Sequence, residues 1–181
     1  MRLDGMRVLV LAADGVEDLE YWVTVMRLRE EGAVVRTAGL APGTVRGKNG
    51  LVVPVEVPVA EVRPDDVDAL VIPGGWAPDK LRRYRAVTDL VGAVHAAGKP
   101  IAIICHGGLV AISARIVAGR RATGSLGIKD DLENAGATWV DEPAFRDGSL
   151  VWGRVVDDIP AFLRETVACF AEHRARVAAG S

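Results

Sequence analysis

A thiol and an imidazole stand side by side at Cys105 and His106, directly after the apolar run 101–104. Gly107 and Gly108 then open a segment of helical character. A sharp turn from a buried strand into a helix lifts a nucleophile above a sheet, and the positive end of the helix favours a thiolate. His106 would move protons or stabilise charge, and the Gly107 amide is a candidate oxyanion donor. The alternative is a buried structural cysteine beside an incidental histidine.

An acidic turn follows the first apolar run, at 7–13. Glu17 lies a few residues beyond that run, and its carboxyl group is a candidate to touch the Cys105 thiol and to deliver or accept a proton. The alternative is that Glu17, Asp18 and Glu20 only complement the positive end of a helix.

Two glycines, Gly74 and Gly75, end another apolar strand. Their amides are candidates to hold a developing oxyanion, although a tight turn with positive φ also requires glycine. Trp76 either walls a pocket or packs on the surface. Asp79 is a candidate to orient His106, as the third member of a triad does, or is an ordinary carboxylate at a helix start.

The remaining chain alternates strand and helix patterns, which predicts a doubly wound, mostly parallel α/β sheet with ligands at the carboxyl ends of the strands. We expect one domain over residues 1–181, with its core at about 6–178. The predicted strands are 7–13, 34–39, 68–75, 101–104, 137–146 and 149–155, with a hairpin over 43–62; the predicted helices cover about 18–31, 78–97, 107–118 and 127–135, and a last one starts near 159.

Apolar spacing in the first helix places Leu19, Trp22, Val23 and Met26 on one side, which we expect to face the core. Asn49-Gly50 and Asp147-Gly148 predict two hairpin turns. Pro54 and Pro58 cannot donate to a strand ladder, so that arm of the first hairpin is expected at a sheet edge.

Composition excludes several classes of protein. The chain has 22 basic and 24 acidic residues, a net charge of −2, which gives no argument for binding nucleic acid or membranes. No apolar run approaches the ~18 residues of a membrane span, and the N-terminus is typical of a strand rather than of a signal peptide. With two cysteines and three unclustered histidines, we expect a reduced cytoplasmic protein without metal or other cofactor.

The chain resembles the ThiJ/PfpI family over nearly its whole length, close to the intracellular cysteine peptidase-like branch of the class I glutamine amidotransferase-like superfamily. The resemblance rests on six segments in the same order: 12–20, 43–50, 68–82, 102–107, 127–141 and the strand of Arg154. It implies a flavodoxin-like three-layer α/β/α sandwich with its nucleophile at Cys105, a carboxyl contact to the thiol from Glu17, and a supporting role for His106.

In hexameric peptidase-like relatives, an acid from a neighbouring subunit reaches this histidine, and that position falls on Asp79. The resemblance therefore implies a homo-oligomer, a dimer or a hexamer. Four positions depart from the family pattern and leave the pocket shape open: Thr24, Gly108, Ser125 and Gly153.

Three functions are considered, and the resemblance favours the first as the family assignment. The first is a cysteine hydrolase of peptides or amides, and the second is a glutathione-independent glyoxalase or deglycase acting on small carbonyls such as methylglyoxal. The third is an oxidative-stress sensor or chaperone without turnover, in which an accessible low-pKa thiol is oxidised. The sequence alone does not choose among them.

Overall fold

The computed structural model describes residues 1–180. Its elements follow in chain order: β1 (Arg7–Leu11), α1 (Asp18–Glu30), β2 (Val34–Gly39), β3 (Gly43–Arg46), β4 (Val52–Val55), β5 (Val57–Pro58), β6 (Ala69–Ile72), α2 (Ala77–Leu81), α3 (Arg85–Ala96), β7 (Ile101–Ile104), α4 (Gly108–Ser113), β8 (Arg121–Ala122), α5 (Lys129–Asn134), β9 (Thr138–Trp139), β10 (Ala144–Asp147), β11 (Leu150–Gly153) and α6 (Ile159–Ala179).

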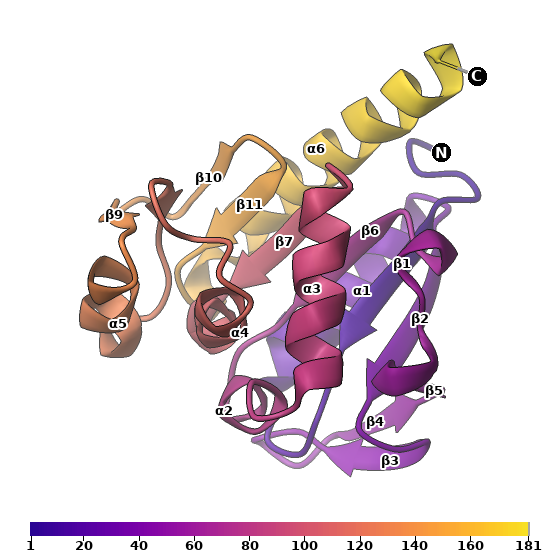
Figure 1. Cartoon of the computed structure of the whole chain (residues 1–181). Coiled ribbons are helices and arrows are strands. Elements are labelled where there is room, and N and C mark those ends of the chain that lie inside the picture. The colour runs from indigo at the N-terminus through magenta and orange to yellow at the C-terminus, as the bar shows by residue number, and fades with distance from the viewer. Residues whose placement is uncertain (181) are drawn as a thin grey trace.

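Seven strands form the central sheet, in the order β10-β11-β7-β6-β1-β2-β5. All neighbours are parallel except β10, which runs antiparallel to β11. Helices α3 and α4 lie in front of the sheet in Figure 1, and α1 and α6 lie behind it. Because both faces are covered, the inner strands β6 and β7 are apolar and buried at every position. The expected flavodoxin-like α/β/α sandwich is confirmed.

Both hairpins form where they were predicted. β3 pairs antiparallel with β4 around Gly50, which has a φ of +101°, and β10 pairs with β11 around Gly148, which has a φ of +63°. Pro58 is the last residue of β5, the strand at the edge of the large sheet, as expected for a residue that cannot donate to a strand ladder. The first hairpin is a separate two-stranded sheet.

Three predicted elements are shorter than their patterns indicated. The helix expected over 78–97 is two helices, α2 and α3, because Tyr84 has an extended backbone (φ −107°, ψ 121°) between them. Helix α4 ends at Ser113, and Arg115 beyond it has a φ of +59°, outside the helical region. The strand expected over 137–146 is divided into β9 and β10.

Helix α1 faces the core with a different side from the predicted one. Leu19, Val23 and Met26 are 47%, 37% and 61% exposed, and of the four predicted residues Trp22 alone packs, partly buried, against the core. The buried side contains Asp18, Glu20, Tyr21, Thr24, Val25 and Leu28. Apolar residues occur on both sides of this helix, so their spacing alone could not identify the buried one.

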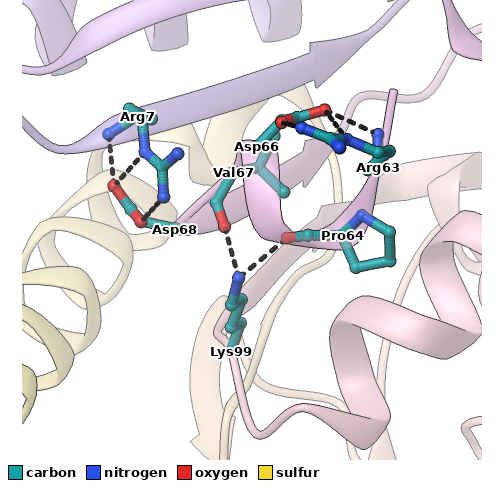
Figure 2. Close-up of polar contacts among 7 residues, drawn as sticks. All are labelled: Arg7, Arg63, Pro64, Asp66, Val67, Asp68 and Lys99. Atoms are coloured by element: carbon teal, nitrogen blue, oxygen red, sulfur yellow. Dashed lines mark hydrogen bonds and ion pairs between the residues drawn. The ribbon is translucent and has the colours of Figure 1, made fainter. Parts of the chain in front are cut away.

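At the amino ends of the strands, polar contacts fix the segment that leads into β6 (Figure 2). Arg7 holds Asp68 with its Nε and Nη2 atoms, at 3.1 and 2.6 Å. The Nζ atom of Lys99 donates to the carbonyl oxygens of Pro64 and Val67, both at 2.7 Å. These contacts fix the start of β6, and its other end leads to Gly74 at the site.

Helix α6 has 21 residues and runs behind the sheet. It begins at a short turn, Val156–Asp158, and its last turns project beyond the sheet in Figure 1. Its buried residues all lie between Ile159 and Phe170. Within residues 1–180, no helix combines the length and the apolar character that a membrane span requires.

Candidate active site

The turn at Cys105 forms the predicted elbow. β7 ends at Ile104, and a 3₁₀ turn over Cys105–Gly107 leads directly into α4. Cys105 has a φ of +58°, a conformation that costs an L-residue about 1–2 kcal/mol. A Cβ atom on Gly107 would lie 2.4 Å from the carbonyl oxygen of Ile72, so glycine is needed for the elbow to pack against β6.

Glu20, rather than Glu17, places its carboxyl group against the Cys105 thiol. Its Oε2 atom accepts a hydrogen bond of 2.6 Å from the Gly74 amide. Its Oε1 atom is buried and has no hydrogen-bond partner within residues 1–180. Burial raises the pKa of Glu20 to about 7, and the nearby charge of Glu17 acts in the same direction. Glu20 therefore holds its proton up to near-neutral pH.

Glu17 is instead the N-cap of α1. Its Oε2 atom accepts from the amides of Leu19 and Glu20, at 2.8 and 2.9 Å. Its Oε1 atom accepts from Asn49 Nδ2 at 3.2 Å. The expected contact between Glu17 and the thiol is therefore wrong, although Glu17 still lines the cavity above Cys105.

The sulfur of Cys105 lies 3.3 Å from Nδ1 of His106. Burial lowers the pKa of His106, so its ring is neutral near pH 7 and can accept a proton. Burial raises the pKa of the Cys105 thiol to about 12, and the negative charge of Glu20 contributes. When Glu20 carries a proton, this charge disappears and its O–H becomes a donor for the thiolate. Cys105 and Glu20 thus titrate as a pair that shares one proton.

Of the two glycines after β6, only Gly75 has an amide that can serve as the predicted oxyanion donor. Gly74 does not provide a donor, because its amide is bonded to Glu20. Gly75 has a φ of +75°, and a Cβ atom there would lie 2.4 Å from the Gly15 carbonyl oxygen. The backbone N–H groups of Gly75 and His106 are directed at the Cys105 sulfur and favour its thiolate. The His106 amide is a further donor, beyond those that the sequence predicted.

A cavity of about 320 Å³ lies above the thiol. Trp76 lines it with an indole that is 61% exposed, and Lys48 Nζ lies 5.7 Å from the centre of that ring. Lys48 belongs to the hairpin turn, and no sequence motif places it at the site. The full lining consists of Glu17, Glu20, Lys48, Gly75, Trp76, Cys105, His106, Ser125, Val155, Val156 and Asp157.

Asp79 does not meet His106 within the chain. Its carboxylate forms an ion pair with Arg83 one turn further along, and its side chain is 57% exposed. No hydrogen bond or ion pair in the described part of the chain joins it to His106, so the triad arrangement within one chain is not formed. Arg154 forms ion pairs with Asp141 and Asp158.

Known proteins of the same architecture carry similar sequences. The sequence model of the DJ-1/PfpI family matches residues 6–169. A Pyrococcus abyssi protein named as a deglycase is 45% identical over 90% of this chain and 98% of its own, and the deglycase PfpI of Pyrococcus furiosus is 41% identical over the same shares. The crystal structure of Drosophila melanogaster DJ-1β superimposes with a TM-score of 0.86, at 27% identity over 97% of each chain. The chain is a member of the DJ-1/PfpI family.

Proposed function

We propose that this protein is an enzyme whose Cys105 thiolate attacks small reactive carbonyl compounds, in a reaction of the glyoxalase or deglycase type. The observation that carries the proposal is the thiol's position between a buried carboxylic acid, Glu20, and a neutral imidazole, His106, at a cavity of about 320 Å³. Relatives that are 41–45% identical bear the name deglycase, which supports it.

With methylglyoxal, the sulfur of Cys105 attacks the aldehyde carbon and forms a hemithioacetal. The developing oxyanion receives hydrogen bonds from the Gly75 and His106 amides and takes up a proton from Glu20. His106 or Glu20 then removes the hydrogen from the attacked carbon as a proton and returns it to the neighbouring carbonyl carbon. The hydroxyl proton of the hemithioacetal passes to the oxygen of that neighbouring carbon, which leaves a hydroxyacyl thioester. Water cleaves the thioester to give the hydroxy acid and the free thiol. The sum is one methylglyoxal plus one water to one lactate and one proton.

The hydrolase activity that the resemblance implied uses the same thiolate. A peptide carbonyl would be attacked at Cys105, and the acyl group would be released by water. The volume of the cavity favours a small substrate over an extended peptide, so we place this reaction second.

A substrate panel tests the proposal. Purified wild-type protein is given methylglyoxal, with lactate measured as the product, and separately a chromogenic peptide. We expect methylglyoxal turnover that Cys105→Ala abolishes and Cys169→Ala retains, since Cys169 lies buried in α6 away from the cavity. Turnover of the peptide alone would establish the hydrolase instead. No turnover of either compound, with Cys105 oxidised by peroxide, would support the sensor.

We also propose a homo-oligomer, in which a second copy covers the exposed side of α1. Leu19, Val23 and Met26 form an apolar stripe there. Leu51 of the hairpin turn is also exposed, and its amide is bonded to the Asp18 carboxylate at the start of α1. Light scattering should give a mass of at least two chains, and Met26→Glu should lower it. A monomeric wild type would refute this arrangement.

A further inference from the structure

One cation lines the cavity above Cys105, the ammonium group of Lys48. It stands over the Trp76 ring and has no ion-pair or hydrogen-bond partner within residues 1–180. Its charge acts on two groups of the site. Burial lowers the pKa of His106, and the charge of Lys48 lowers it further. Burial raises the pKa of Glu20, and the charge of Lys48 partly opposes that increase. The exposed side chain of Lys48 therefore places a positive charge at the edge of the cavity above Cys105.

The backbone around Lys48 is held by the site itself. The Lys48 amide donates to the Val16 carbonyl oxygen at 2.8 Å. The buried carboxylate of Asp18 accepts from the amides of Asn49 and Leu51, at 2.6 and 2.8 Å. Position 48 is thus fixed relative to α1 by backbone hydrogen bonds that are independent of its side chain.

The carboxyl groups of the cavity do not neutralise Lys48. Glu17 is fully engaged with the amides at the start of α1 and with Asn49. Glu20 is bonded to the Gly74 amide and lies against the thiol. Asp157 is an exposed residue of the turn before α6 and forms no ion pair with Lys48 in the described chain. An anionic group on the substrate is the partner that Lys48 lacks.

We propose that Lys48 selects carbonyl substrates that bear a carboxylate near the carbon attacked by Cys105. The inference rests on the proposed function, since it specifies the substrate class of the same thiolate. A single ammonium group balances one carboxylate charge, and the same positive charge disfavours carbonyl adducts carried on cationic amines.

Alkylation of Cys105 by two reagents of nearly equal size tests the inference without requiring turnover. Iodoacetate is anionic and iodoacetamide is neutral; with each, the thiolate sulfur bonds to the methylene carbon and iodide leaves. The ratio of the two alkylation rates does not depend on the pKa of the thiol, because both reagents react with the same thiolate. We expect this ratio to fall about five- to tenfold in Lys48→Gln and to be retained in Lys48→Arg. Mass spectrometry in a Cys169→Ala background assigns the label to Cys105.

Lys80→Gln is the matched control, since it removes the same charge from α2 outside the cavity and should leave the ratio unchanged. High salt should lower the wild-type ratio toward that of Lys48→Gln. The inference is overturned by a Lys48→Gln ratio within twofold of wild type, by an equal loss in Lys80→Gln, or by a Cys105 that neither reagent labels. A Lys48-dependent ratio in a protein that turns over no carbonyl compound, with or without a carboxylate, would instead refute only the proposed reaction.

Discussion

The buried acid at Glu20 should make the folded protein less stable as pH rises, and Glu20→Gln should remove this effect. Burial raises the pKa of Glu20 to about 7, against an ordinary value of 4.5. Below pH 4.5 the acid is protonated in both the folded and the unfolded chain and contributes nothing. Between pH 4.5 and 7 the unfolded chain releases the proton and the folded chain keeps it, so the free energy of unfolding falls. At 1.36 kcal/mol per pH unit, the full loss is about 3 kcal/mol.

Urea unfolding at pH 5, 6, 7 and 8, at fixed protein concentration and with reductant, measures this difference. We expect the stability of Glu20→Gln relative to wild type to rise by about 2.5 kcal/mol across the series, while the variant loses turnover. The glutamine oxygen can still accept from the Gly74 amide, so the packing is kept. In a Cys105→Ala background the same pH dependence should persist, because burial is its largest cause. Parallel pH profiles for wild type and variant would refute the assignment of a buried, protonated Glu20.

Three further predictions concern the elbow, the hairpin turn and the exposed acid. Cys105→Gly should unfold at a free energy about 1 kcal/mol above Cys105→Ala in urea titrations, because glycine adopts a φ of +58° without strain; equal stabilities would contradict strain at the elbow. Gly47→Ala should lower stability by about 1–3 kcal/mol in the same measurement, since its Cβ atom would lie 2.3 Å from Asp18 Oδ1. Asp79→Ala should change stability by no more than about 0.5 kcal/mol, yet reduce kcat if a partner subunit's His106 uses this carboxylate; unchanged kcat in an oligomer would exclude that role.

The order of elements and both hairpins could be predicted because their signals are local. Buried parallel strands are continuous apolar runs, and Asn49-Gly50 and Asp147-Gly148 carry their turn chemistry within two residues. The buried side of α1 could not be predicted, because Tyr21, Val25 and Leu28 form a second apolar stripe beside the exposed one. Only packing against the sheet distinguishes the two stripes.

The elbow at Cys105 was predictable, but the acid beside it was misassigned by one helical turn. A residue at the N-cap turns its carboxyl group back to the first amides, so Glu17 is used in capping α1. Glu17 followed three residues later by Glu20 matches the capping pattern of a helix start. This pattern could have indicated that Glu17 caps α1. Lys48 is distant from Cys105 in sequence, and only the docking of the hairpin turn onto α1 brings it to the cavity. The cytoplasmic location and the absence of a cofactor stay predictions.

The direction of α6 determines where a surface or another protein can be attached without covering the cavity. The helix starts next to the cavity-lining residues Val156 and Asp157 and ends at Ala179, and 21 residues at 1.5 Å each extend over roughly 30 Å. Its exposed last turns project away from the sheet (Figure 1). A tag or fusion partner joined at the C-terminus would therefore be held at the far end of the molecule. Protein immobilised in this way should keep the mouth of the cavity open to added substrate.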